Sequence, residues 1–206
     1  REGGEVGALY ADRRVEKNDE GYIPYTPGQT IATENTTPFK IGTVNPKWNL
    51  GWRHGFNYKG INASVMFTAR IGGNVISKTQ ATLDRFGVSK TSADARETGY
   101  VMLGNIKMEP QDYYGTIYDL DSYYVYSATN IRLQEASIGY TLPNKWFGNV
   151  VKNVNVSVYG TNLWMIYNKA PYDPELTAST GTFGQGYDYF MLPSSRTYGF
   201  SLKFGF

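Results

Sequence analysis

Large apolar residues alternate with polar or small ones in five stretches of the chain, a pattern that predicts β-strands with one apolar and one polar face. In the last stretch, TYGFSLKFGF, every second residue is a large apolar one. The tight Lys59-Gly60 turn predicts that the first two stretches form an antiparallel hairpin. The five expected strands cover about Trp48–Tyr58, Ile61–Val75, Asn130–Leu142, Asn153–Tyr167 and Thr197–Phe206.

The segments between these strands alternate between short and long. Two are short, namely Lys59-Gly60 and Pro143–Lys152, whereas the segments at about Ser77–Ser127 and Asn168–Ser195 are long and polar. Strands of about 10 residues joined in this way are typical of an outer-membrane β-barrel, with short periplasmic turns and long extracellular loops. We therefore expect an all-β chain, with an extracellular loop region at 1–46 and antiparallel barrel strands and loops at 47–206.

Each strand of such a barrel has a lipid face and a lumen face. An arginine on the lipid face costs about 2–4 kcal/mol at the bilayer midplane, so Arg70 is assigned to the lumen. The residues expected to face lipid are Ile61, Val65, Phe67, Ile138, Val154, Val156, Phe200 and Leu202. Those expected to face the lumen are Asn62, Ser64, Thr68, Arg70, Asn155 and Ser157.

The aromatic run at the end of the sequence has two interpretations. It is a terminal barrel strand with one lipid-facing side, or it is a half-buried edge strand of a soluble sheet, which would be prone to aggregation if exposed. Barrel proteins as a class tend to end in an aromatic residue that the insertion machinery reads, and Phe206 has that position. The candidate residues for barrel assembly are Tyr198, Phe200, Leu202, Phe204 and Phe206.

Composition narrows the class of protein. Aromatic residues make up 16% of the chain and 23 of its 206 residues are glycine, which suits β-structure with many turns. The formal net charge of +2 argues against a nucleic-acid partner. There is no cysteine, and no stretch approaches the ~20 apolar residues of a membrane helix.

Side chains suited to catalysis or metal binding are few. His54 is the only histidine, and it lies within an expected strand with no partner spacing for a catalytic triad or a metal site. Loose acidic groups, Asp112 with Asp119 and Asp121, and Asp173 with Glu175, do not match a calcium-binding loop. We expect no enzyme activity, no cofactor and no metal, and interpret these carboxylates as solvated loop charges; the alternative is that they bind a cation.

Several segments together resemble one family of membrane transporters. NIRLQEASIGYTLPNKWF, VSVYGTNLWMIYNKAPYDPEL and SSRTYGFSLKFGF, in this order, resemble the closing segments of SusC/RagA-like TonB-dependent outer-membrane transporters. Upstream, EVGALYA and VNPKWNLGWRHGFNYKGINASVMFTARIGGNV resemble the preceding segments of that family. The similarity extends over nearly the whole chain.

This resemblance implies a bacterial outer-membrane location and the C-terminal section of a barrel of about 22 strands that a plug domain fills. It implies uptake of glycans or peptides, with TonB and a SusD-like surface lipoprotein as partners. The plug, the TonB-contacting segment and the remaining strands would belong to a longer polypeptide. Five strands leave two open edges, which hydrocarbon does not tolerate, so the barrel needs these further strands.

The long loops contain the candidate binding residues. Tyrosine combines an apolar ring with a hydroxyl group, which suits contacts to sugars, peptides or a partner protein. We expect contributions to substrate or lid binding from Tyr113, Tyr114, Tyr172, Asp173, Tyr187 and Tyr189. The alternatives are that these tyrosines pack the loops together, or that the chain is a secreted soluble β-domain that binds carbohydrate. A small autonomous porin would require at least eight strands.

Overall fold

The chain forms two compact units in a computed structural model that describes residues 3–104, 106–146, 152–176 and 184–205. We call them the strand unit and the loop unit. The strand unit comprises Pro46–Gly72, Ala128–Lys169 and Pro193–Phe206, and the loop unit comprises Arg1–Asn45, Gly73–Ser127 and Ala170–Leu192. Each is described by itself.

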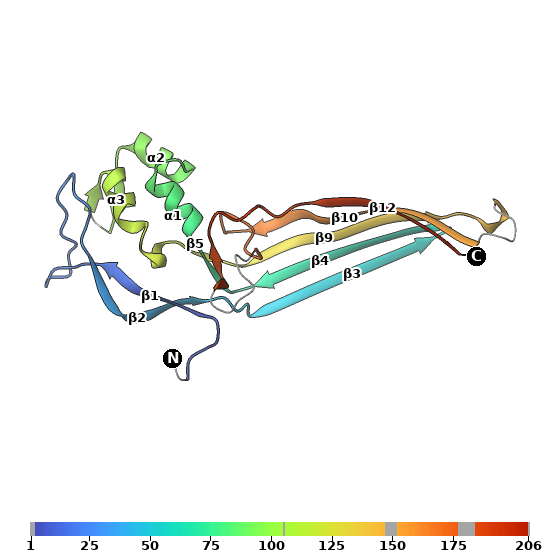
Figure 1. Ribbon diagram of the computed structural model, residues 1–206, viewed down its shortest axis with the longest axis horizontal. Helices are drawn as coiled ribbons and strands as arrows, with labels where there is room; N and C mark the ends of the chain where they lie inside the picture. The colour runs from blue at the N-terminus through green and yellow to red at the C-terminus, as the bar shows by residue number, and fades with distance from the viewer. Residues whose placement is uncertain (1–2, 105, 147–151, 177–183, 206) are drawn as a thin grey trace. The chain divides into compact units, whose positions relative to one another are not determined.

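The strand unit is one antiparallel sheet (Figure 1). Its strands lie in the order β12-β10-β9-β4-β3, and every neighbouring pair is antiparallel. A short 3-10 helix, η2 (Asn144–Trp146), follows β9. The strands are β3 (Trp48–Tyr58), β4 (Ile61–Ile71), β9 (Asn130–Thr141), β10 (Lys152–Asn168) and β12 (Thr197–Gly205).

All five expected strands are present, but the second is shorter than the sequence pattern predicts. Strand β4 ends at Ile71 rather than Val75 because Gly72 and Gly73 have φ angles of 84° and 82°. These values are favourable only for glycine, and they break the extended backbone. The chain resumes as β5 (Asn74–Ser77), which belongs to a different sheet.

The loop unit contains three small sheets. Its first hairpin pairs β1 (Ala8–Val15) with β2 (Thr33–Thr43), within the segment 1–46 that was expected to be a loop region. Strand β5 lies between its partners β11 (Tyr187–Asp188), which is parallel to it, and β8 (Val125–Ser127), which is antiparallel. The third sheet is a hairpin of β6 (Val101–Leu103) and β7 (Ile106–Met108).

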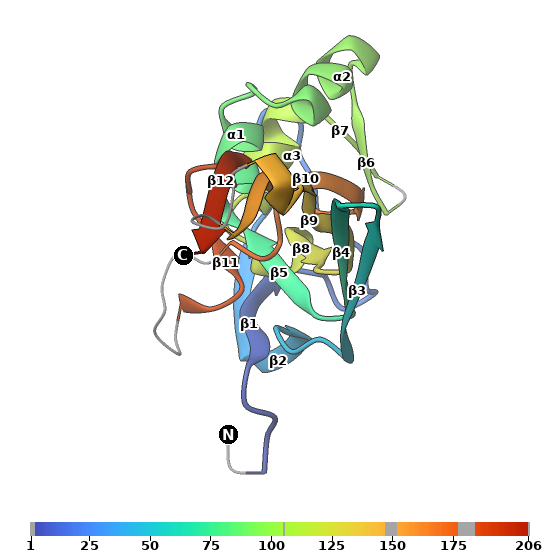
Figure 2. The ribbon, with the colours of Figure 1, turned by 90° about the vertical axis from the view of Figure 1, so that its right-hand side faces the viewer.

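Three helices correct the expectation of an all-β chain with an irregular loop at 77–127. They are α1 (Lys78–Arg85), α2 (Lys90–Thr98) and α3 (Pro110–Ile117), and a 3-10 turn, η1 (Asp121–Tyr123), follows them. Ser77 and Ser89 cap α1 and α2 by accepting backbone N–H groups, and Gly99 ends α2 in a left-handed conformation. Figure 2 shows the three helices together.

The buried core lies mainly in the loop unit. One cluster includes Val15, Met108 and Leu120, and a second joins Ala81 of α1 to Tyr114 and Ile117 of α3. A third cluster consists of Leu9, Val44 and Ile76. Hydrogen bonds between backbone and side chains add to this packing. For example, the Asp112 carboxylate accepts a hydrogen bond of 2.9 Å from the backbone N–H of Gly28. The loop unit therefore has its own packed interior.

Candidate functional site

One face of the strand unit is a continuous apolar surface. The register places Trp52, Phe67 and Leu133 side by side, and it aligns Ile138, Val158 and Phe200 across β9, β10 and β12. Many of these side chains are exposed, including 59% of Trp52 and 79% of Phe200. A contiguous apolar patch of this kind indicates a surface that meets lipid or another apolar surface.

The opposite face is polar and linked by hydrogen bonds between strands. The hydroxyl groups of Ser64 and Ser137 lie 2.8 Å apart, and Thr141 accepts hydrogen bonds of 2.9 Å from both Asn62 and Asn155. Farther along this face, Glu135 forms an ion pair with Arg53 of β3. The hydrogen bonds and the ion pair on this face thus connect side chains that are distant in the sequence.

The predicted division of residues between the two faces can be compared with the register. Arg70 pairs with Asn130 and Thr68 with Arg132, on the face opposite Phe67, as the alternation predicts. Val154 differs from the other apolar residues, because it is only 7% exposed and lies beside a register irregularity between β10 and β12. The exposed apolar row of β10 begins at Val156.

The terminal strand β12 has the expected alternation. Its large side chains are exposed, and Leu202 and Phe200 pair with Val156 and Val158 of β10. On the other face, the Tyr159 ring lies so close to Gly199 that a Cβ there would collide with it. Tyr198 and Phe204 are also exposed, whereas the predicted residue Phe206 lies outside the described residues.

The structure places Tyr113 and Tyr114 on α3, where Tyr113 is half-buried and Tyr114 is buried. Their rings meet edge to face with centroids 5.1 Å apart. Tyr114 is 7% exposed, and its hydroxyl donates to the Thr91 carbonyl at 3.4 Å. Burial is the main cause that raises the pKa of Tyr113 to about 12, and burial also raises the pKa of Tyr114. Both phenols are therefore neutral at physiological pH.

The other four predicted loop residues differ in exposure. Tyr172 and Tyr187 are half-buried, and burial raises the pKa of each phenol. Asp173 is also half-buried, and its carboxylate accepts the backbone N–H of Glu175 at 3.1 Å in a tight turn. Tyr189 is 65% exposed and meets the exposed Phe190 edge to face. Among these predicted residues, Tyr113 and Tyr114 contact each other on α3, and Tyr189 follows β11.

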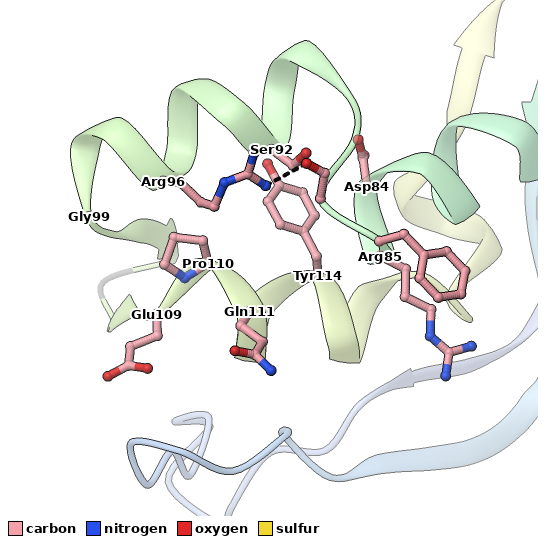
Figure 3. Close-up of a pocket in the computed structure, with 11 residues that line it drawn as sticks. Asp84, Arg85, Ser92, Arg96, Gly99, Glu109, Pro110, Gln111 and Tyr114 are labelled. Atoms are coloured by element: carbon pink, nitrogen blue, oxygen red, sulfur yellow. Dashed lines mark hydrogen bonds between the residues drawn. The ribbon is translucent and has the colours of Figure 1, made fainter.

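The helices of the loop unit enclose a cleft that the sequence did not reveal. It has a volume of about 650 Å³, within the usual range for ligand pockets. Buried Asp84, Ser92 and Tyr114 line its interior, and the exposed residues Arg96 and Glu109 lie nearer to solvent (Figure 3). Of the predicted residues, Tyr114 alone is among those that line this cleft.

The described ranges hold neither a cluster of metal-binding side chains nor a membrane-spanning helix. No group of three or more histidine or acidic residues there could hold a metal ion. No helix in that part of the chain is long and apolar enough to cross a membrane. His54 lies in β3 on the apolar face, with its ring stacked on Trp52 at a centroid distance of 5.8 Å.

Known proteins resemble this chain in sequence and in fold. No protein-family model matches it. It is 26% identical over 172 residues to TonB-dependent receptor P3 of Formosa agariphila, a match that covers 80% of this chain and 17% of that receptor. The fold is similar to part of a chain in the structure of the RagAB peptide importer in its open-open state. That match covers 97% of the present chain, with a TM-score of 0.64 and 17% sequence identity. The closed-closed state matches 93% with a TM-score of 0.60 and 17% identity.

The chain is thus homologous to one section of a TonB-dependent receptor. More specifically, its fold is that of a part of a SusC-like, RagA-type barrel, as the sequence resemblance implied. It spans 17% of the receptor and 22% of the importer chains. The matched proteins are a TonB-dependent receptor and a peptide importer.

Proposed function

We propose that this chain forms part of the wall and of the extracellular loops of an outer-membrane importer that works with TonB. The observation that carries the proposal is the exposed apolar face of the five-stranded sheet, opposite a hydrogen-bonded polar face. In a barrel the apolar face contacts the acyl chains and the polar face lines the lumen or covers the plug. Under this proposal no other protein has to cover the apolar face, because lipid surrounds it.

The proposed topology follows from the order of the strands. The Lys59-Gly60 turn lies at the same end of the sheet as the end of β9 and the start of β10, since Ile61 pairs with Tyr140 and Asn155 pairs with Thr141. We assign this end to the periplasm because short turns are periplasmic in such barrels. The segments 1–46, 72–129 and 169–196 are then extracellular, where substrate first arrives.

The loop unit would act in recognition. Long loops on a rigid scaffold commonly provide binding residues. We propose that its exposed aromatic residues contact substrate or a SusD-like surface lipoprotein that covers the barrel. Tyr189 is the best placed of the predicted residues, because most of its side chain is exposed. The buried Tyr114 would support the loop from within.

The cargo is proposed to be a glycan or a peptide. The matched structures are of a peptide importer, and tyrosine-rich surfaces bind both sugars and peptides. Energy would come from TonB through a part of the polypeptide outside this section. The remaining strands and the plug would complete the barrel and close the open edges of β3 and β12.

Cysteine labelling of whole cells tests the orientation. The section has no cysteine of its own, so one cysteine can be placed at Lys90 of α2 and another at Lys145 of η2, both exposed positions. In the full-length receptor, a membrane-impermeant maleimide should label the Lys90→Cys variant on intact cells and the Lys145→Cys variant only after the outer membrane is opened. Labelling of Lys145→Cys on intact cells would reject the proposed orientation.

A further inference from the structure

Arg96 lies in the cleft between the helices of the loop unit and contacts the segment that joins α1 to α2. The Arg96 side chain donates a hydrogen bond of 2.5 Å from Nη1 to the carbonyl oxygen of Gly87. Gly87 has a φ angle of 69°, and a Cβ at this position would collide with the guanidinium group. The absence of a side chain at residue 87 therefore gives Arg96 the space that it occupies.

This guanidinium group has donors left for a ligand. Arg96 forms no ion pair within the described part of the chain. Its hydrogen bond to Gly87 uses one of five N–H donors, so the planar fork can still bind a carboxylate in two-point geometry. Figure 3 shows Arg96 directed toward Tyr114.

Of the other charged groups that line the cleft, Glu109 is an acid, and Asp84 and Arg85 already have partners within the chain. Asp84 already accepts hydrogen bonds from Ser89 Oγ at 2.5 Å and from Gln80 Nε2 at 2.7 Å. The guanidinium carbon of Arg85 lies 3.9 Å from the centroid of the Tyr118 ring, so this arginine is stacked. Arg96 is thus the cation that remains available in the cleft.

We propose that this cleft binds a carboxylate group of the imported ligand through Arg96, with Ser92 and Tyr114 in its interior. The volume of about 650 Å³ admits a short oligomer rather than a single ion. A carboxylate of this kind occurs in an acidic peptide or in a uronic-acid glycan. The proposal rests on the proposed import function and defines its substrate class as acidic.

Calorimetry on the purified full-length receptor tests this inference with two pairs of probes. One pair is acetyl-Glu-Glu-Glu-amide and acetyl-Gln-Gln-Gln-amide, and the other is trigalacturonate and its methyl ester. At least one acidic probe should bind, and more tightly than its neutral counterpart. Binding of the acidic peptide indicates a peptide cargo, and binding of trigalacturonate indicates an acidic glycan.

Variants then locate the binding. Arg96→Gln should weaken binding of the acidic probe at least about tenfold, as expected when a charge-assisted contact is lost. The matched control is Lys90→Gln, which removes one positive charge from the same helix outside the cleft and should change affinity less than about twofold. Arg96→Lys keeps the charge but loses the fork, so its affinity should fall between the two.

Failure to bind either acidic probe, or equal affinity of Arg96→Gln and the parent receptor, would overturn the inference. Both results concern the cleft alone if the receptor still assembles and still supports uptake. If the parent receptor itself supports no uptake, that result would instead contradict the import function. If Arg96→Gln does not assemble, the comparison is made with Arg96→Lys.

Discussion

Replacing Val65 with arginine tests which face of the sheet meets lipid. Val65 lies on the apolar face of β4, between His54 of β3 and Ala136 of β9. The adjacent Ser64 lies on the polar face, where its hydroxyl group contacts that of Ser137. The variants Val65→Arg and Ser64→Arg therefore place the same charge at nearly the same depth on opposite faces.

The expected cost follows from the position of Val65 along its strand. It is four residues beyond Ile61, where β4 begins, which is about 14 Å along the strand at ~3.4 Å per residue. A strand tilt of about 40° reduces this to about 10 Å of depth in an apolar band about 25 Å tall. Val65 is thus near the midplane, where a lipid-facing arginine costs about 2–4 kcal/mol. That cost lowers the folding equilibrium about 30-fold to 900-fold.

The assay is unfolding of the full-length receptor in lipid vesicles, followed by the loss of its heat-modifiable band on a gel. Val65→Arg should unfold at a clearly lower urea concentration than the parent, whereas Ser64→Arg should change the midpoint little, because the lumen is polar. A third variant, Ile71→Arg, lies near the end of the strand and should cost about 0–1 kcal/mol. Equal destabilisation by Ser64→Arg and Val65→Arg would refute the assignment of the faces.

Three further predictions concern the terminal strand, the tyrosines and an exposed carboxylate. Changing Phe204 and Phe206 to Ser should reduce the amount of folded receptor in the outer membrane, and unchanged amounts would exclude a role for these rings in assembly. Tyr114→Ala should destabilise the loop unit by about 3 kcal/mol because it leaves a cavity. Tyr189→Ala should leave the thermal unfolding of the loop unit unchanged but weaken uptake. Equal losses of stability in the two variants would contradict this distinction. Hydrogen bonds from Lys40, and then from Thr43 and Asn45, lower the pKa of Glu5 to about 2. Because the folded-state pKa is lowered, Glu5 should stabilise its segment at pH above about 4.5 and lose this effect as the pH falls toward 2. Hydrogen exchange at the Val44 amide, which donates to the Gly7 carbonyl, should become faster over this pH range. The Glu5→Gln variant should not show this pH dependence.

The strand unit could be predicted from the sequence because its signal is local. Alternation of apolar and polar residues reports which side of a strand is apolar, and it placed all five strands within a few residues except at the end of β4. Two glycines at 72–73 end that strand, although the apolar residues Val75 and Ile76 continue beyond them. The buried position of Val154 was also missed, since the irregular pairing of β10 with β12 depends on contacts between strands.

The helices and the cleft could not be derived in the same way. Helices α1 and α2 have mostly polar sequences, KTQATLDR and KTSADARET, and few residues of either are buried. Their capping residues, Ser77, Ser89 and Gly99, were the available signals, because serine before a helix and glycine after it mark helix ends. Arg96 could be recognised as a candidate only once the helices had brought it beside Gly87 and Tyr114.

The pairing of β4 with β9 has a consequence for how the segment between these strands can change. Arg70 near the end of β4 pairs with Asn130 at the start of β9, and the amide of Gly72 donates to the Thr129 hydroxyl at 3.0 Å. The segment 73–128 therefore leaves the sheet and returns to it at adjacent points. Closing a long loop between such points costs little more than closing a shorter one. Evolution, or an engineer, could exchange the segment between Gly72 and Thr129 for one with a different surface while the sheet keeps its register.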